Sequence, residues 1–273
     1  MNILTKLPAH IAFFAVLLTA TVAHAHEYWI QPHQYRIEIG ENIVADVRVG
    51  QDFRGNTLAY FPNNFSAFEV TDPSGTHPIE GRIGDMPAAD IPTTINGLHV
   101  LSQFTTTSQL TYDDYAKFER FILKHGMDWV LAAHAERGLP DDGFAEGYTR
   151  FVKALVAVGD GAGADHFEGM FFEMVALKNP YTDNVSTGLP VMILFRGEPL
   201  TNTQIDIFYR ADGDATLSHV VTGADGSALI PNQGDGEYMI NAVHMIIPFE
   251  EDIARTGIVW HSLWASMTYR LGR

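Results

Sequence analysis

Apolar and polar residues alternate with a period of two along the first part of the chain. The alternation runs from Tyr35 to Ile39 and again from Ile43 to Val49, with the turn-forming sequence Gly40-Glu41-Asn42 between them. Successive side chains of a β-strand point to opposite faces, so this pattern predicts a β-hairpin with one buried face. Further strands are predicted at residues 68–70 and 97–104. The first part of the chain therefore has the size and pattern of an immunoglobulin-like β-sandwich.

The spacing of apolar residues becomes helical between about residues 111 and 158. Apolar residues at 115, 118 and 122 follow the sequence Thr111-Tyr112-Asp113-Asp114, which has the hydroxyl and acidic residues of a helix N-cap, and Gly126 ends the predicted helix. A second helix is predicted from Trp129, and a third from the apolar face shared by positions 144, 148, 151 and 155. We expect these helices to form an insertion that packs on a sheet.

Closely spaced glycines in Gly159-Asp160-Gly161-Ala162-Gly163 predict a flexible linker over residues 159–168. Beyond it the period of two returns in short segments, at 169–177, 190–195, 205–210, 228–231, 238–244 and 259–269. These segments predict a second β-sandwich. The sequence thus predicts a mainly β protein of two β-sandwich domains, residues 26–158 and 169–273, with the helical insertion at about 111–158 in the first.

Residues 1–25 have the pattern of a secretory signal peptide. Lys6 precedes the apolar run Ile11–Leu18, and Ala23-His24-Ala25 has the small residues of a cleavage site. The apolar run is too short to span a bilayer. We therefore expect cleavage after Ala25 and a periplasmic mature chain without a membrane span. The alternative is an uncleaved signal anchor.

Charge and composition narrow the classes of partner. The chain of 273 residues has a formal net charge of −16, and Lys6 is the only charged side chain before His26, so cleavage would leave −17. This charge argues against a nucleic-acid partner, because a phosphate-binding protein needs basic surface. There are no cysteines, which excludes disulfides and thiolate metal sites. A transition metal would have to be held by His, carboxylate, Met or backbone groups.

Cleavage after Ala25 would make His26 the first residue of the mature chain and so create a metal-binding group. The free α-amine and the imidazole Nδ1 atom of an N-terminal histidine close one chelate ring on a metal ion. A second histidine would complete a three-nitrogen site, which suits Cu(II) and also Ni(II) or Co(II). The ordinary pKa of an α-amine is about 8, so a metal ion displaces its proton at small cost. The alternative is that His26 follows the cleavage site by coincidence.

Three further residues are candidate metal ligands. His244 ends a predicted strand, and His261 lies in the last one. Glu173 would supply a carboxylate ligand or orient a histidine by a hydrogen bond. His244 is the preferred second ligand of His26, because the ends of strands meet at the rim of a sandwich. For each of the three, the alternative is a buried, hydrogen-bonded polar residue.

The sequence lacks the signatures of several common enzyme classes. It has no G-x-S-x-G nucleophile elbow, no H-E-x-x-H motif and no glycine-rich cofactor loop. Its carboxylates could supply an acid–base pair, but no spacing selects one. We therefore expect a binding protein rather than an enzyme.

Seven segments of the chain carry a family resemblance: His26–Pro32, Gly50–Gly55, Glu146–Leu155, Glu173–Tyr181, Phe195–Leu200, Asn241–Met245 and Trp260–Thr268. They resemble an exported bacterial family of unknown function that is associated with periplasmic components of nickel and cobalt uptake systems. The second half also resembles transthyretin-like or carboxypeptidase-regulatory-like β-sandwiches. The resemblance implies a β-sandwich fold, a periplasmic location and divalent-metal binding, with His26 and His244 inside matching segments.

Three hypotheses about function follow. The first is a periplasmic protein that captures Ni(II), Co(II) or Cu(II) and delivers it to an inner-membrane transporter. The second is a copper histidine-brace oxidase built on the same His26 chelate. The third is a non-metal ligand-binding or adhesion module, which aromatic residues such as Trp29, Trp260 and Trp264 favour.

Overall fold

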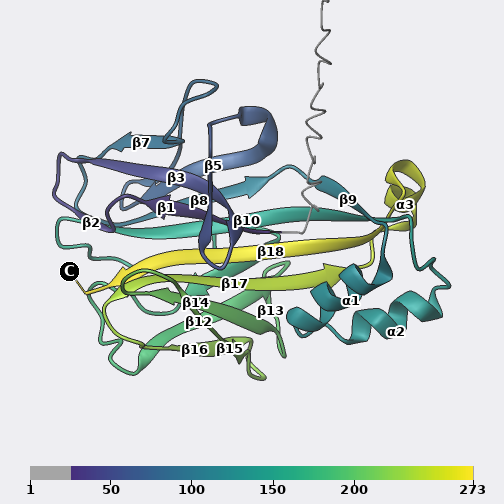
Figure 1. Cartoon of the computed structure of the whole chain (residues 1–273). Coiled ribbons are helices and arrows are strands. Elements are labelled where there is room, and N and C mark those ends of the chain that lie inside the picture. Colours follow the sequence, from purple (N-terminus) through teal and green to yellow (C-terminus); the bar gives the residue numbers. More distant parts are fainter. Residues whose placement is uncertain (1–25, 273) are drawn as a thin grey trace, which may run out of the picture.

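A ten-stranded β-sheet, the central sheet, runs through the middle of the molecule (Figure 1). The computed structural model describes residues 26–272, and the predicted signal peptide lies outside them. The strand order is β15-β14-β17-β18-β10-β8-β5-β6, with β2 and β9 also paired to β10. The strands of this sheet are β2 (Arg36–Ile37), β5 (Phe65–Asp72), β6 (Gly75–Pro78), β8 (Gly97–Thr105), β9 (Ser108–Tyr112), β10 (Phe144–Val158), β14 (Gln204–Arg210), β15 (Thr216–Val221), β17 (Gly236–Ile246) and β18 (Ile258–Leu271).

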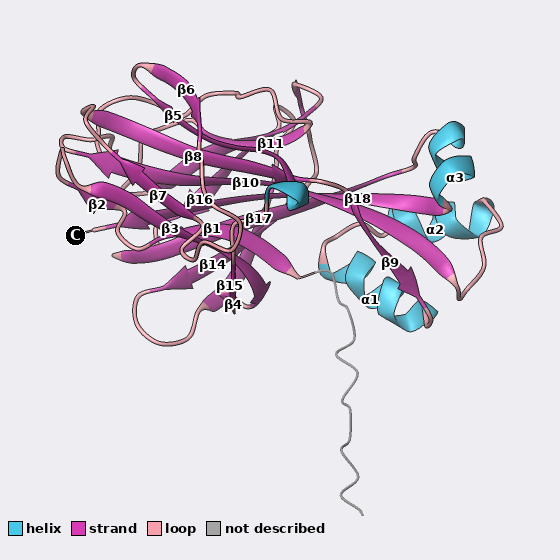
Figure 2. Cartoon of the chain, turned by 90° about the horizontal axis from the view of Figure 1, so that it is seen from above, coloured by secondary structure: helices cyan, strands magenta, loops and turns pink. Residues whose placement is uncertain are grey.

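Two four-stranded sheets cover opposite faces of the central sheet (Figure 1), and Figure 2 shows the same layers from above. The N-terminal sheet consists of β1 (Glu27–Pro32), β3 (Asn42–Gln51), β4 (Arg54–Leu58) and β7 (Ala89–Pro92). The C-terminal sheet consists of β11 (Phe172–Ala176), β12 (Gly188–Phe195), β13 (Glu198–Pro199) and β16 (Ser227–Pro231). The prediction of a mainly β protein with sandwich layers is confirmed. The layers are stacked, and the middle one is shared.

Strand β10 is buried on both of its faces. Val152 and Val156 belong to the core under the N-terminal sheet, whereas Phe151 and Leu155 belong to the core under the C-terminal sheet. A strand covered on both sides is apolar along most of its length rather than at alternate positions. The predicted third helix over residues 144–155 is therefore wrong. Its helical spacing of apolar residues arises because both faces of a strand are apolar.

Strand β10 also joins the two halves of the chain. It pairs in parallel with β18, in a register that runs from Ala145 opposite Ile258 to Ala154 opposite Thr268. Because β10 precedes the predicted linker at 159–168 and β18 follows it, one sheet contains strands from both predicted domains. The division of the chain into two domains stays a prediction.

The other two predicted helices are present, as α1 (Tyr115–Lys124) and α2 (Trp129–Glu136), together with α3 (Glu250–Thr256) and a 3-10 helix (Pro62–Asn64). The N-cap of α1 is Asp114, whose side chain accepts a hydrogen bond from the Ala116 N–H, and not the region of Thr111. Thr111 is still paired within β9, so the helix starts later than predicted. None of the helices within residues 26–272 is long and apolar enough to cross a membrane.

The first hairpin also differs from the prediction. Strand β1 pairs with β3, and the chain between them crosses to the central sheet, where β2 pairs with β10. Tyr35 packs in the core under the C-terminal sheet and Ile37 in the core under the N-terminal sheet, while Ile39 is exposed. The apolar residues of this segment are therefore buried in two different cores and do not form one face of a hairpin.

Trp29 of β1 ties the N-terminal sheet to strands from the second half of the chain. It is fully buried and packs with Phe53, Phe208 of β14 and Met239 of β17. The rings of Trp29 and Phe53 meet edge-on with their centroids 5.5 Å apart. This contact connects layers that are far apart in sequence.

We expect Trp29→Ala to lower the free energy of unfolding by about 3–5 kcal/mol, because it removes a large buried ring that nothing nearby can replace. The matched control is Trp129→Ala on α2, where the ring is 48% exposed and the expected loss is at most about 1 kcal/mol. Urea unfolding followed by circular dichroism measures both. Equal losses for the two variants would contradict this packing.

Candidate functional site

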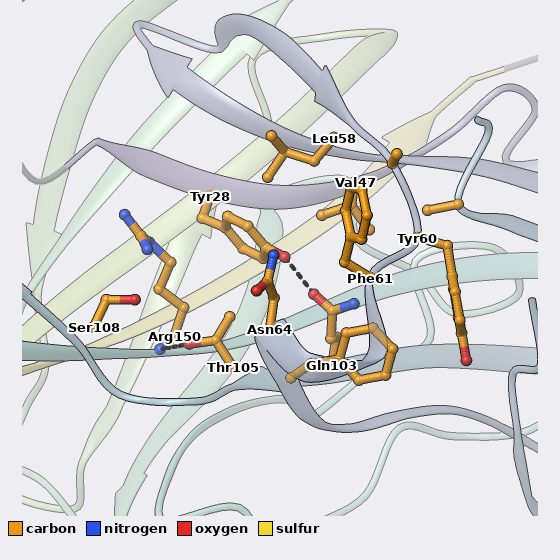
Figure 3. A pocket seen from close by; sticks show the side chains of 13 residues that line it. Tyr28, Val47, Leu58, Tyr60, Phe61, Asn64, Gln103, Thr105, Ser108 and Arg150 are labelled. Carbon is orange, nitrogen blue, oxygen red and sulfur yellow. Dashed lines mark hydrogen bonds between the residues drawn. The ribbon is translucent and has the colours of Figure 1, made fainter. Parts of the chain in front are cut away.

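A pocket of about 360 Å³ lies between the N-terminal sheet and the central sheet (Figure 3). Strands β1, β3 and β4 supply one side of it, and β8, β10 and the start of β9 supply the other. The lining residues are Tyr28, Val47, Leu58, Ala59, Tyr60, Phe61, Asn64, Phe65, Ala88, Gln103, Thr105, Ser108 and Arg150. Apolar and aromatic side chains with a few polar groups, one of them charged, are typical of a small-molecule site.

Arg150 is the charged residue of this pocket. It lies on β10, and its side chain points to the same face as Val152, toward the N-terminal sheet. The guanidinium carbon is 5.2 Å from the ring centroid of Tyr28 and 4.5 Å from that of Tyr148, so aromatic rings hold it through cation–π contacts. Figure 3 shows the side chain beside the ring of Tyr28. The position of the cation is therefore fixed before any ligand binds.

Within residues 26–272, no carboxylate forms a direct ion pair with the guanidinium of Arg150, although the charge of Glu146 acts on it from farther along β10. The residue is only 9% exposed, yet it forms no ion pair there, and its Nε atom is buried without a hydrogen-bond partner. Its Nη2 atom donates to the carbonyl oxygen of His26 at 3.4 Å. Burial lowers the pKa of Arg150 from its ordinary value, which reflects the cost of keeping this charge out of water.

Two neutral polar groups lie farther along the pocket. The Tyr28 hydroxyl donates to Gln103 Oε1 at 2.5 Å, as the dashed line in Figure 3 marks. Burial raises the pKa of Tyr28, so the hydroxyl stays protonated. The backbone N–H of Arg150 donates to Thr105 Oγ1 at 3.1 Å, which ties β10 to the end of β8. These contacts fix the walls of the pocket and leave a single charge in it.

A buried carboxyl group lies on the same strand as Arg150. Glu146 is fully buried, and it accepts hydrogen bonds from the Tyr112 hydroxyl at 2.8 Å and from the Ser262 hydroxyl. Trp264 Nε1 donates to the same Ser262 oxygen at 3.0 Å. Burial raises the pKa of Glu146 to about 7, against the lowering effects of the two hydroxyls and of Arg150. Its charge therefore changes near neutral pH.

His26 lies on the side of the N-terminal sheet. Its carbonyl oxygen contacts Arg150, and the adjoining Glu27, which is 3% exposed, accepts a hydrogen bond from Lys124 Nζ at 3.2 Å. The Glu27 carboxylate also accepts from the backbone N–H of Asp52 at 3.2 Å. The start of β1 is thus held by groups from three other elements or turns of the chain.

His244 and His261 lie on the other side of the central sheet. The His244 ring contacts Phe172 and Phe195 of the C-terminal sheet, at centroid distances of 5.9 and 4.8 Å. His261 Nε2 is 2.9 Å from the hydroxyl of Thr149, which points to the opposite face of β10 from Arg150. The structure therefore does not bring His26 and His244 together. The two residues are separated because side chains alternate between the faces of β17, and His244 points away from the face that β1 covers.

Glu173 is fully buried in an ion pair. Its Oε1 atom is 2.6 Å from Lys153 Nζ, and its two oxygens accept hydrogen bonds from the backbone N–H groups of Glu168 and Met170. Glu173 is therefore placed as a buried, hydrogen-bonded polar residue, which was the alternative to its role as a metal ligand. Within residues 26–272, no three His, Asp or Glu side chains are grouped as ligands of one metal ion.

Sequence reasoning missed Arg150 and Glu146 because it assigned their segment to a helix. A usable signal was present: two ionisable residues, four apart, interrupt a stretch that is otherwise rich in apolar residues. On a strand, residues an even number apart share a face. Assigned to a strand, the segment would have placed two charges on one buried face. Burying a charge costs free energy unless a partner or a ligand compensates it.

Taken together, the fold and the pocket define a three-layer β protein with a cavity around a buried arginine. The chain belongs to the family described as Domain of unknown function (DUF4198), whose family model matches residues 23–246.

Solved structures give only distant similarities. A tetra-tandem repeat in the extending region of a large adhesion protein is 13% identical, with a TM-score of 0.23, over 91% of this chain and 50% of that one, so this chain spans about half its length. The D0–D1 domain of intimin is 12% identical, with a TM-score of 0.21, over 88% of this chain and 96% of that one. These TM-scores are too low to support an argument. No curated protein matches the chain.

We expect Glu146→Gln to stabilise the protein above pH 7. The pKa of Glu146 is raised in the folded state from 4.5 to about 7, so the folded protein binds more protons than the unfolded chain between these pH values, and stability falls as pH rises through them. Glutamine keeps the hydrogen bonds without the charge. The gain should reach about 3 kcal/mol at pH 8 and vanish near pH 4.5.

Urea unfolding at both pH values measures this difference, with Glu119→Gln on the exposed face of α1 as the control. A loss of stability at pH 8, or the same gain at both pH values, would show that burial does not penalise the charge of Glu146.

Proposed function

We propose that this protein binds a small organic anion, with the carboxylate of the ligand on Arg150 and its apolar body in the pocket. The observation that carries the proposal is the buried guanidinium without a direct ion-pair partner among the described residues. A buried charge without a direct partner destabilises a fold, so its presence is best explained by a ligand that pairs with it. A guanidinium offers paired N–H donors that match a carboxylate.

The pocket itself supports a ligand of limited charge and partly apolar character. Its volume of about 360 Å³ lies at the small end of typical ligand sites. Val47, Leu58, Tyr60, Phe61 and Phe65 offer apolar surface away from Arg150. A second carboxylate would have no cation in the pocket to meet. The ligand class that fits best is a monocarboxylate with an aromatic or aliphatic body.

The overall charge of the protein makes the local cation important. A net charge of −16 repels anions, but this repulsion is screened over a Debye length of about 8–10 Å in physiological salt. Arg150 is screened much less, because it is buried. The signal-peptide pattern of residues 1–25 supports a role in the periplasm, where such a protein would capture a solute.

Benzoate and benzamide provide a matched test of this proposal, because they share a shape and differ in charge. We expect the protein from His26 onward to bind benzoate in calorimetric titration, and benzamide far more weakly. Arg150→Met should weaken benzoate binding by about 10- to 100-fold, the range expected for losing a charge-assisted hydrogen-bonded pair. Because Arg150→Met removes a buried charge that has no direct ion-pair partner, it should leave the unliganded protein equally or more stable.

Arg82→Met is the control for general charge effects, since the Arg82 side chain is 91% exposed. Leu58→Trp, which fills the pocket without touching the cation, should also abolish binding. Equal binding of benzoate and benzamide, or unchanged benzoate binding by Arg150→Met, would contradict the proposal.

Metal binding is the second candidate function, and the placement of His244 and His261 favours it. The two residues lie on neighbouring strands and on one face, because His244 is opposite Leu263 and His261 is opposite Ile246. Such diagonal neighbours are within reach of long side chains. Burial lowers the pKa of His244 to about 4 and also lowers that of His261, so both imidazoles are neutral and able to coordinate a metal at pH 7.

In this second candidate, the protein carries Ni(II), Co(II) or Cu(II) to an inner-membrane transporter, as the resemblance to uptake components suggests. His26 would form a separate chelate on the other face if residues 1–25 are removed. The firm hold on the start of β1 supports that possibility, since it would keep the new N-terminus in place.

Titration of the chain that begins at His26 with each metal separates these sites. If the histidine pair is the site, His244→Ala and His261→Ala will each lower Ni(II) affinity at least tenfold, and His26→Ala or an added N-terminal alanine will not. The reverse pattern would identify the N-terminal chelate, and unchanged affinity in all four variants would exclude both.

A further inference from the structure

The buried carboxyl group of Glu146 is the strongest feature that the proposed function leaves unused. Glu146 and Arg150 point to the same face of β10, with Tyr148 between them. The guanidinium of Arg150 packs on the ring of Tyr148, so it extends back along the strand toward Glu146. They form no ion pair by direct contact, but Arg150 lowers the pKa of Glu146 through their charges. The two groups are therefore electrostatically coupled.

The surroundings of Glu146 contain few other charges. Tyr112 of β9 and Ser262 of β18 donate hydrogen bonds to it, and Trp264 donates to Ser262. From the helices, His125 faces the ring of Trp264 at 5.3 Å, and His134 Nδ1 accepts from Trp260 Nε1 at 3.0 Å. Among the described residues, Arg150 is the one charged group that shifts the pKa of Glu146.

A ligand carboxylate on Arg150 would change this balance. It would cancel the positive charge that favours ionised Glu146, and it would add a second negative charge to a region sheltered from water. Protonation of Glu146 removes the repulsion between its carboxylate and the carboxylate of the ligand. Protonated Glu146 keeps a hydrogen bond to each hydroxyl, because its O–H can donate to one of them after that hydroxyl rotates, while its carbonyl oxygen still accepts from the other.

We propose that the pocket binds its organic anion together with one proton, which Glu146 takes up, so that binding weakens as pH rises above neutral. This inference rests on the proposed function. One carboxylate and one proton enter, no covalent bond changes, and the net charge of the complex equals that of the free protein. A purely structural Glu146, which only links β9 to β18, would show no such dependence on the ligand.

The coupling of the two residues is tested first without a ligand. Carboxyl ¹³C NMR of the protein from His26 onward follows the ionisation of Glu146, assigned by its absence in Glu146→Gln. We expect a midpoint near neutral pH that moves upward in Arg150→Met, because the stabilising cation is gone. Arg82→Met should leave it unchanged. An unchanged midpoint in Arg150→Met would overturn the proposed coupling.

Benzoate then tests the binding linkage, since it stays ionised from pH 6 to pH 9. Calorimetry in buffers of different ionisation enthalpy counts protons taken up per benzoate. We expect uptake to approach one proton above the midpoint of Glu146, with affinity falling by about tenfold per pH unit there. Glu146→Gln should bind benzoate with the same affinity at every pH and take up no proton, whereas Glu119→Gln should behave as wild type.

The outcomes separate the two proposals. If benzoate binds without proton uptake, the proton linkage is wrong and the anion site stands. If benzoate binds to no form of the protein at any pH, the anion site and the linkage built on it both fall. Proton uptake that persists in Glu146→Gln would assign the proton to another group and overturn this inference.

Discussion

The double burial of β10 is the constraint on which the rest of the structure depends. One strand faces the N-terminal sheet with one set of side chains and the C-terminal sheet with the other, and it pairs in parallel with the last strand of the chain. Each four-stranded sheet therefore buries part of its apolar face against β10. A polar residue on this strand lies in the interior whichever way it points, so it must be compensated by a partner or by a ligand.

Lys153 and Arg150, the two basic residues of β10, show both outcomes. Lys153 points toward the C-terminal sheet and is compensated, with its Nζ atom 3.0 Å from Asp165 Oδ1 and 2.6 Å from Glu173 Oε1. Burial lowers the pKa of Lys153, but these carboxylates outweigh it and raise the pKa above its ordinary value. Arg150 points the other way and has no such partner within residues 26–272. The contrast on one strand is what makes the Arg150 pocket a candidate binding site.

Much of the fold was accessible from sequence, because most strands have one buried face or clear turns at their ends. The segments at 97–104, 190–195 and 205–210 became β8, β12 and β14, and the helices α1 and α2 lie where their spacing predicts. Sequence reasoning failed at β10, which contacts both cores, because a strand without an exposed face loses the alternation that identifies it. The site was missed for the same reason. The pairing of His26 with His244 required knowing which face of a shared sheet each residue occupies, and local patterns do not contain that information.

The central claim is that aromatic contacts hold the Arg150 guanidinium in place and that a ligand carboxylate binds to it. The most direct measurement is a crystal structure of the protein from His26 onward with benzoate. The account predicts density for benzoate in the pocket, its carboxylate oxygens within hydrogen-bond distance of the Arg150 guanidinium and its ring toward Tyr60 and Phe61. Benzoate bound elsewhere, or a carboxylate side chain of the protein itself on Arg150, would contradict it.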